Sequence, residues 1–395
     1  MAWNQGSQAP RPSDSIRWLQ QKPAEMKHLI RAAVVFGALA TYASAQTPQD
    51  LEILHVRGNI YVLFGAGGNI TLSVGPDGVL MVDSGDAEKA KLVLAAIEQI
   101  QRQRALGVDR TGLGWGAETR SSVVAERDPS GPAKPIRYII NTHVHRDHVG
   151  GNETLAAAGR TFTGGNVAGD IRDASVGAAV LAHENVEIGL RTPPDGTPAA
   201  PPRALPTETY YGEGMRISHF FNGEGIEILH RPSAHTDGDS IVRFRGSDVI
   251  AAGDLFVTET YPVIDLERGG NIQGVVESLN RILDLAFPEF RTEGGTMIVP
   301  GHGRIADSAD VAYYRDMVTI IRDRVQSMIK KGMTLEQVKS AKPTADYDPR
   351  YGATAGPWTT DMFVEAVYRS LAPGAPSTGA LVPTLADAEA SAAAE

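Results

Sequence analysis

Short apolar runs that stop abruptly at small and polar residues recur along the chain. Residues 135–142 are apolar and rich in β-branched and aromatic side chains, a pattern that predicts a buried strand. Four further runs of this kind lie at 79–82, 226–229, 249–253 and 296–301. Strands that end in this way deliver polar side chains to one edge of a sheet assembly, where open α/β folds hold their sites.

Apolar residues at helical spacing accompany these strands. Residues 87–104 read as a helix, and residues 311–331 carry apolar side chains three or four positions apart. A last helix is predicted over residues 363–371. The mixture of predicted strands and helices is typical of an α/β protein.

The rest of the chain departs from this pattern. Residues 107–135 are rich in turn formers and residues 164–213 include a proline-rich stretch, so both are predicted insertions, either pocket-forming lids or disordered surface. They interrupt a catalytic domain assigned to residues 46–330. A helical extension is expected over 331–371, and the Ala/Pro-rich tail 372–395 is expected to be disordered.

The first 45 residues resemble a targeting segment. From Met26 the chain has basic residues, a short apolar stretch and the cleavage motif Ala43-Ser44-Ala45, which together predict a signal peptide over 26–45. Residues 1–25 are polar and are expected to be either a disordered leader or residues ahead of the true start at Met26. The apolar stretch is too short to span a bilayer. We therefore expect a periplasmic or secreted protein that is free of the membrane after processing.

Composition narrows the function classes. The 395 residues could form two domains, but single-domain folds with insertions reach this length. A net charge of −10 offers no basic surface for nucleic acid. The chain has no cysteine, which any thiolate-based metal site or nucleophile would need.

Residues 143–148 read His-Val-His-Arg-Asp-His, directly after the predicted strand 135–142. Three of the chain's 10 histidines and one aspartate share these six positions: His143, His145, Asp147 and His148. In extended chain His143 and His145 would point the same way, and the glycines that follow allow the turn that brings the other two around. This density of donors predicts a metal site.

Further donors follow the other apolar runs: Asp83, His235, Asp254 and His302. Asp83 can also cap the helix predicted after it. His230 competes with His235, but its position directly after a strand suits a sheet-surface side chain. His183 precedes a predicted helix and is interpreted as structural, while Asp237 and Asp239 are interpreted as residues that shape the loop around a ligand.

In this order, these residues resemble the five motifs of the metallo-β-lactamase superfamily, over about residues 51–315. The resemblance implies an αββα four-layer sandwich of two mixed β-sheets flanked by helices. It implies one metal ion bound by His143, His145 and His235. It implies a second ion bound by Asp147, His148 and His302, with Asp254 bridging the two and Asp83 supporting the histidine loop.

Imidazole and carboxylate donors suit catalytic zinc, and two metal ions about 3.5–4 Å apart can share a hydroxide and polarise a carbonyl. Without cysteine, the ligand set resembles glyoxalase II-like thioesterases, lactonases and atypical lactamases. The prediction is an exported dinuclear zinc hydrolase acting on a small-molecule ester, thioester, lactone or β-lactam amide. The resemblance implies that Asp147 is catalytic, holding the bridging hydroxide and later moving its proton. The alternative is an iron-dependent oxidoreductase like the persulfide dioxygenases, since such donors also accept iron or manganese.

Overall fold

The computed structural model describes residues 51–106, 133–160, 177–194, 196–217, 220–288 and 294–372. All of them belong to the compact unit Leu51–Glu395. The predicted signal peptide 26–45, the leader 1–25 and nearly all of the predicted insertion 107–135 and tail 372–395 lie outside the described residues.

The first sheet has seven strands in sequential order. The first four pair antiparallel, and β4 to β7 pair in parallel. The strands are β1 Glu52–Arg57, β2 Ile60–Phe64, β3 Ile70–Gly75, β4 Gly78–Val82, β5 Ile136–Ile140, β6 Ala179–His183 and β7 Glu208–Tyr210. The sheet is therefore mixed, and the parallel half carries the histidine-rich loop at the end of β5.

The second sheet has five strands in the order β12-β11-β10-β9-β8. Only β11 and β12 pair in parallel, so this sheet is also mixed. Its strands are β8 Gly214–Arg216, β9 Ile226–His230, β10 Ser240–Phe244, β11 Val249–Ala251 and β12 Met297–Val299.

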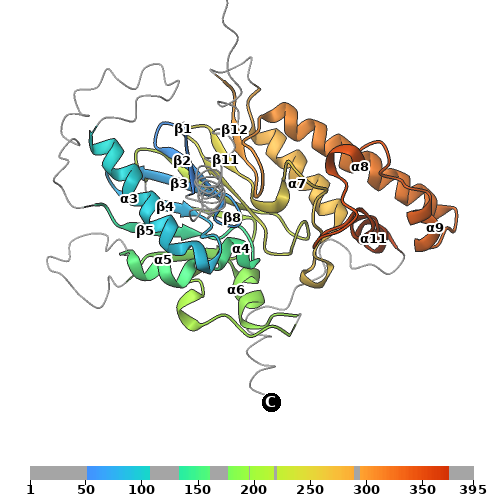
Figure 1. Ribbon diagram of the computed structural model, residues 1–395, viewed down its shortest axis with the longest axis horizontal. Coiled ribbons are helices and arrows are strands. Elements are labelled where there is room, and N and C mark those ends of the chain that lie inside the picture. Colours follow the sequence, from blue (N-terminus) through green and yellow to red (C-terminus); the bar gives the residue numbers. More distant parts are fainter. Residues whose placement is uncertain are drawn as a thin grey trace, which may run out of the picture. The chain divides into compact units, whose positions relative to one another are not determined.

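Helices cover the outer face of each sheet (Figure 1). On the first sheet lie α3 Ala90–Leu106, after the 3₁₀ turn Ala87–Lys89, and α5 Asn152–Ala158; on the second lie α7 Ile272–Leu285, α8 Ser308–Lys330 and α11 Thr360–Leu371. Shorter elements are the helices α4 Arg146–Val149, α6 Glu184–Arg191, α9 Leu335–Ser340 and α10 Asp348–Tyr351, and the 3₁₀ turns Pro202–Ala204, Gly253–Leu255 and Leu266–Arg268. Among the described residues, no helix is both long and apolar enough to cross a membrane.

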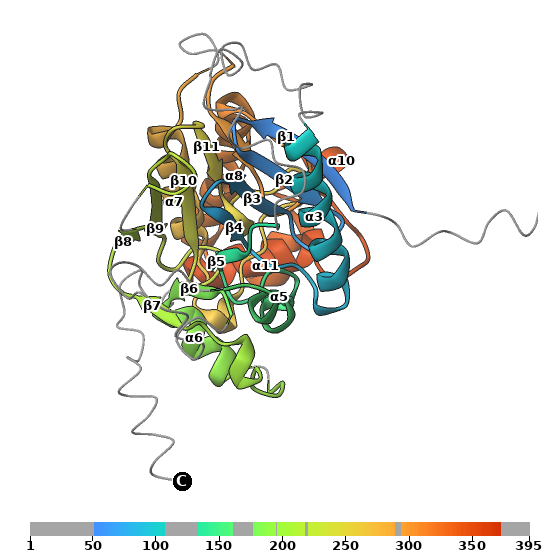
Figure 2. The ribbon, with the colours of Figure 1, turned by 90° about the vertical axis from the view of Figure 1, so that its left-hand side faces the viewer.

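Three apolar layers hold these elements together. Alternate strand residues such as Val62 and Leu80 of one sheet and Ile228 and Val242 of the other form the layer between the sheets. A second layer joins the first sheet to α3. Period-2 alternation in strands explains why each sheet supplies residues to two layers. Figure 2 shows the two sheets from the side, with α3 and α5 beside β2 to β5.

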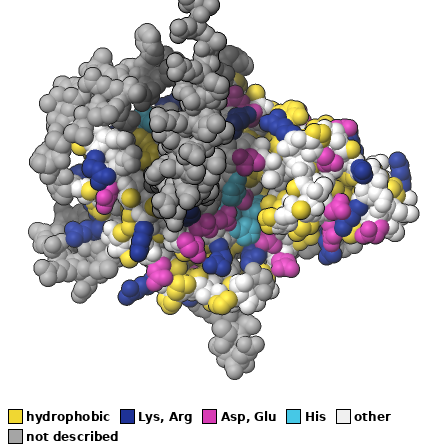
Figure 3. Space-filling model, viewed as in Figure 1, with side chains coloured by type: hydrophobic (Ala, Val, Ile, Leu, Met, Phe, Trp, Pro, Cys, Tyr) yellow, Lys and Arg dark blue, Asp and Glu magenta, His cyan; other side chains and the backbone are white. Residues whose placement is uncertain are grey.

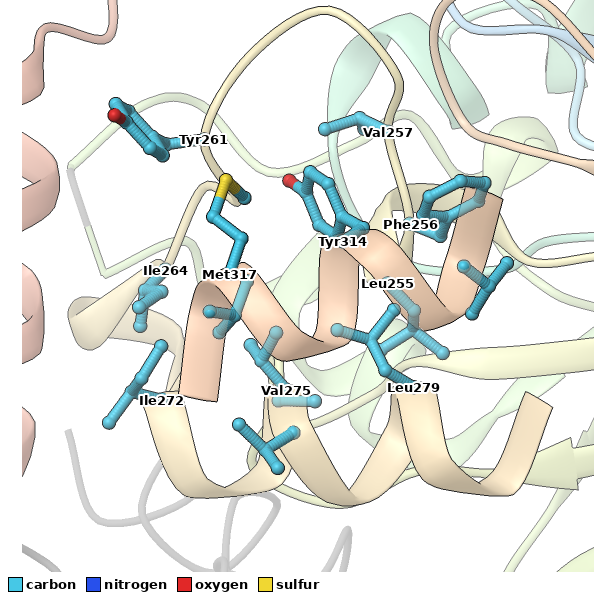
Figure 4. Packing of buried hydrophobic residues seen from close by; sticks show 14 of the residues in the cluster. Leu255, Phe256, Val257, Tyr261, Ile264, Ile272, Val275, Leu279, Tyr314 and Met317 are labelled. Atoms are coloured by element: carbon cyan, nitrogen blue, oxygen red, sulfur yellow. The ribbon is translucent and has the colours of Figure 1, made fainter. Parts of the chain in front are cut away.

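The third layer joins the second sheet to α7, α8 and α11. In the close-up of Figure 4, Val275 and Leu279 of α7 lie next to Tyr314 and Met317 of α8, below the segment that carries Phe256. The sequence of layers is helix, sheet, sheet, helix, and it confirms the predicted α/β sandwich of two mixed sheets.

The described part of the segment 164–213, residues 177–194 and 196–213, differs from the insertion expected there. It contributes β6 and β7 to the first sheet and α6 beside them. The run Ala179–His183 is buried throughout, and a strand buried on both faces of a parallel sheet shows no alternation of apolar and polar residues. This part of the chain therefore belongs to the fold that positions the site.

Candidate metal centre

Seven potential metal ligands come together at one edge of the two sheets, each delivered by the end of a strand. They form two neighbouring groups, and within each group one donor atom per residue lies within 4.8 Å of the others. The first group is His143, His145, His235 and Asp254, and the second is Asp147, His148 and His302. These are the seven residues that the sequence predicts, and the six other than Asp254 are divided as the resemblance implies, while Asp254 falls in the first group. Histidine and acidic side chains gather at the surface near the middle of the face shown in Figure 3.

Asp83 directs the protons of two of these histidines. Its carboxylate accepts hydrogen bonds from the Thr142 backbone N–H, the Thr142 hydroxyl and His148 Nδ1, each at 2.7 Å. A carboxylate is acceptor-only, so the proton of His148 must lie on Nδ1 and its Nε2 faces the second group. Because the Thr142 hydroxyl donates to Asp83, its oxygen accepts from His143 Nδ1 at 3.0 Å.

His143 Nε2 is then left without a proton, and it is buried with no hydrogen-bond partner among the described residues. Buried polar atoms are nearly always satisfied, so an unpartnered one at such a cluster calls for an explanation. A bound cation is the simplest partner for an imidazole lone pair.

The other two histidines of the first group lead to the same conclusion. His145 Nε2 lies 3.0 Å from Asp265 Oδ2, and His235 Nδ1 lies 2.8 Å from the Val263 carbonyl oxygen. Both partners only accept, so both of these nitrogens carry protons. In the neutral tautomers His145 Nδ1 and His235 Nε2 therefore face each other at 2.9 Å. A contact between two imidazole nitrogens at this distance needs either one shared proton or a metal ion, and a metal ion would satisfy both lone pairs.

Asp254 lies between the two groups. Its Oδ2 is 3.9 Å from His143 Nε2 and 3.7 Å from His235 Nε2, while its Oδ1 is 3.3 Å from His148 Nε2. Oδ1 is buried and has no hydrogen-bond partner among the described residues. One carboxylate oxygen faces each group, as a bridging ligand requires. In the second group, His302 Nε2 lies 3.1 Å from Asp147 Oδ2.

The pKa values of the metal-free centre follow from burial and neighbouring charge. Burial holds the pKa of His143 well below its ordinary value and lowers that of His235 to about 4, so both are neutral at pH 7. Burial opposes ionisation of Asp254, yet the charge of His148 keeps its pKa well below the ordinary value. For His148 burial is outweighed by Asp254 and Asp83, which raise its pKa. Where no metal is bound, a proton on His148 thus balances the carboxylates.

Two glycines allow backbone to pass close to these side chains. A Cβ on Gly68 would meet the His148 ring, and a Cβ on Gly301 would overlap Asp254 Oδ1. The loops are tied together here, because Gly68 N donates to the Asp147 carbonyl at 2.9 Å and Asn69 N to the Gly301 carbonyl at 2.8 Å.

We expect Gly301→Ala to weaken metal binding strongly, because the added methyl must displace either Asp254 or the loop that carries His302. Overpacking of this kind also costs about 1–3 kcal/mol of stability. Metal content after dialysis and thermal unfolding measure the two effects. The control is Gly225→Ala, where the atoms nearest to the new Cβ belong to the side chains of Phe220 and Arg245, at 3.3 Å or more. If both variants retain metal equally, Gly301 has no special role at the centre.

The remaining candidates lie outside the two groups. His230 Nε2 donates to the Asp237 carbonyl at 2.8 Å, and the His230 ring stacks on His183 with ring centroids 3.6 Å apart. Asp239 accepts from the backbone and hydroxyl of Thr236. These residues shape the loop that carries His235.

Two residues that hold ligands, Asp265 and Val263, were not predicted from the sequence; they contact His145 and His235. They lie in Tyr-Pro-Val-Ile-Asp (261–265), which follows no predicted strand. The pairing of a carboxylate with a metal-ligating histidine is a general expectation, but nothing local in the sequence assigns it to Asp265.

Residues 63–302 match the family model of the metallo-beta-lactamase superfamily. The chain belongs to the metallo-beta-lactamase superfamily. Its fold is similar to that of the stereoselective inverting sec-alkylsulfatase Pisa1 from Pseudomonas sp., with a TM-score of 0.50 and 15% identity over 84% of this chain and 52% of that one. A double mutant of the sec-alkylsulfatase PisA1 gives a TM-score of 0.51 with 16% identity, covering 81% of this chain and 50% of that one.

This superfamily member therefore spans about half the length of those alkylsulfatase chains. A metallo-beta-lactamase from Pontibacter korlensis aligns with a TM-score of 0.42 and 14% identity, over 68% of this chain and 99% of that one. The search of curated proteins gives no match.

Proposed function

We propose that this protein is a dinuclear metal-dependent hydrolase that uses zinc to cleave an ester, thioester, lactone or β-lactam amide of a small molecule. The observation that carries the proposal is the pair of imidazole nitrogens, His145 Nδ1 and His235 Nε2, which face each other at 2.9 Å beside Asp254, whose two carboxylate oxygens face the two groups. Neutral imidazoles and carboxylates fit catalytic zinc. Two bound metal ions would polarise the scissile carbonyl and make a bound water acidic enough to ionise near neutral pH.

Asp147 is the carboxylate suited to moving the proton. Its side chain is 36% exposed, against 9% for Asp254, so it lies between the centre and solvent. Burial would raise its pKa, but the hydrogen bond with His302 and the charge of His148 lower the pKa to about 2. Asp147 is therefore ionised at neutral pH and can accept the proton of the attacking water at a carboxylate oxygen. The same oxygen can then return this proton to the leaving group.

The test is an activity panel on the purified protein after loading with zinc. β-Lactams, lactones, thioesters and carboxylic esters form the first set, and a secondary alkyl sulfate is added because Pisa1 is a sec-alkylsulfatase. We expect hydrolysis of at least one carbonyl substrate, its loss with a chelator and its return with zinc. Hydrolysis that is insensitive to chelators, or none by fully loaded protein, would overturn the proposal.

Metal analysis of protein purified without added metal separates the hydrolase from the iron-dependent oxidoreductase. The hydrolase predicts about two zinc ions per chain. Iron at that stoichiometry, together with oxygen consumption, would favour the oxidoreductase.

We also propose export, on the signal-peptide pattern of residues 26–45. Amino-terminal sequencing of the mature protein should then begin at Gln46. An unprocessed protein in the cytosol would contradict export without affecting the metal chemistry.

A further inference from the structure

Asp265 is outside the proposed ligand set, yet it contacts two histidines of the first group. Its Oδ2 lies 3.0 Å from His145 Nε2, and its backbone N–H donates to the His235 carbonyl oxygen at 2.9 Å. Its side chain is 15% exposed, so solvent competes little for these contacts. Asp265 thus connects the segment after Tyr261 to two ligands of the first group, His145 and His235.

The Asp265 carboxylate is itself held from several sides. Oδ1 accepts from the backbone N–H groups of Glu267 and Arg268, both at 3.1 Å, and Oδ2 accepts from Arg268 Nη1 at 2.9 Å. The Asp265 carbonyl accepts from Gly270 N at 2.7 Å. Two backbone N–H groups and a guanidinium thus donate to the carboxylate, which is therefore a fixed acceptor.

A fixed acceptor decides which nitrogen of His145 is available to a metal ion. Because Oδ2 can only accept, it holds the proton of neutral His145 on Nε2 and leaves Nδ1 unprotonated. The other tautomer would place a proton on Nδ1, directly between His145 and His235, where it would block coordination. Resting on the proposed function, we propose that Asp265 is a positioning residue that selects the metal-binding tautomer of His145 and so sets the affinity of the first metal ion.

The second ion depends on a different support. His148 is held by Asp83 through a hydrogen bond of 2.7 Å. No hydrogen bond or ion pair given for the described residues connects Asp265 to the second group. A change at Asp265 should therefore lower the affinity for the first metal ion and leave the affinity for the second unchanged.

The test is Asp265→Asn. The asparagine oxygen can still accept from the backbone of Glu267 and Arg268, but the amide –NH₂ that replaces Oδ2 is a donor and opposes the His145 Nε2 proton. The affinity for one of the two zinc ions should fall about 10–100-fold, the usual effect of losing such a partner, while the other stays unchanged. Competition with a chelating dye measures both affinities. The visible spectrum of the cobalt-substituted protein should change for one site only.

Asp307→Asn is the matched control. Asp307 also caps a helix, accepting at Oδ1 from Ala309 N and Asp310 N at 2.8 and 2.9 Å, but it contacts no histidine in the hydrogen bonds of the described residues. The Asp307→Asn variant should bind both zinc ions with the affinities of the wild type. Equal losses in both variants would mean a general structural effect and overturn the inference. Two tightly bound ions in Asp265→Asn would overturn it while leaving the proposed function intact, whereas a wild type without metal would overturn both.

Discussion

Replacing Asp254 with alanine is expected to release both metal ions and to lower kcat/KM by more than about a hundredfold, the upper end of what loss of an outer partner costs. Asp254 is the one carboxylate of the cluster that faces both groups, with Oδ1 3.3 Å from His148 Nε2 and Oδ2 3.7 Å from His235 Nε2. Its removal takes a negative charge from a buried site that must hold two dications. No other side chain of the two groups has a donor atom on both sides.

Metal content after dialysis measures the stoichiometry, and thermal unfolding gives a second readout. At a metal concentration 100 times the Kd, binding stabilises the wild type by about 2.7 kcal/mol, so a chelator should lower its Tm but leave that of the variant unchanged. Asp307→Asn is the control, because Asp307 caps a helix and contacts no histidine in the hydrogen bonds of the described residues. Two retained ions in Asp254→Ala would contradict the bridging assignment.

The ends of these strands could be predicted from the sequence because each apolar run gives way to polar residues within a few positions. The run 79–82 is fully buried in β4 and stops at Asp83. The run that became β11 is also fully buried, those that became β5, β9 and β12 are buried in part, and each ends close to polar residues. A sheet surrounded by apolar layers leaves its strand ends as the place where polar groups can meet, so the edge that carries the site follows from the pattern.

The residues that orient the ligands could not be predicted in this way. Asp265 reaches His145 across 120 positions of the chain, and only the packing of the Leu266–Arg268 turn against the centre brings them together. β6 was hidden for a different reason, since a strand buried on both faces has no polar alternation to mark it. β7 was hidden because it is a strand of three residues, two of them exposed, with no apolar run. Local patterns thus identified the donors, whereas the tertiary fold determines which nitrogen each histidine presents.

This distinction bears on how the centre binds metal. Asp83 fixes His148 directly and His143 through Thr142, while Asp265 and the Val263 carbonyl fix His145 and His235. The coordinating nitrogens are thereby directed inward before an ion arrives, although His148 must first lose the proton on its Nε2. Ordering the donors in advance reduces the entropy lost on binding and is the physical basis of a preorganised site.

A comparison of His148→Ala with His183→Ala should distinguish the loss of a metal ligand from the loss of a packed side chain. Both histidines are buried, with His148 0% and His183 4% exposed. His148→Ala removes a donor of the second group and leaves the buried Asp83 carboxylate short of one hydrogen bond, at a cost of about 1–3 kcal/mol. The second ion should be lost, with kcat/KM falling by more than about a hundredfold. His183→Ala should cost stability alone, about 0.5–1.5 kcal/mol for its ring contacts plus a cavity term.

Metal stoichiometry, kcat/KM per folded molecule and thermal unfolding must be measured on both variants. His183 stacks on His230 and accepts from Asn185 N at 3.3 Å, and burial lowers its pKa to about 3, so it is a neutral packing group at neutral pH. His148→Ala should therefore retain less metal than His183→Ala. A chelator should also lower the Tm of His148→Ala by less, because that variant has less bound metal to lose. Equal losses of metal would show that the ligand set has been assigned to the wrong histidines, because only His148 lies at the strand edge where Asp254 and His302 converge.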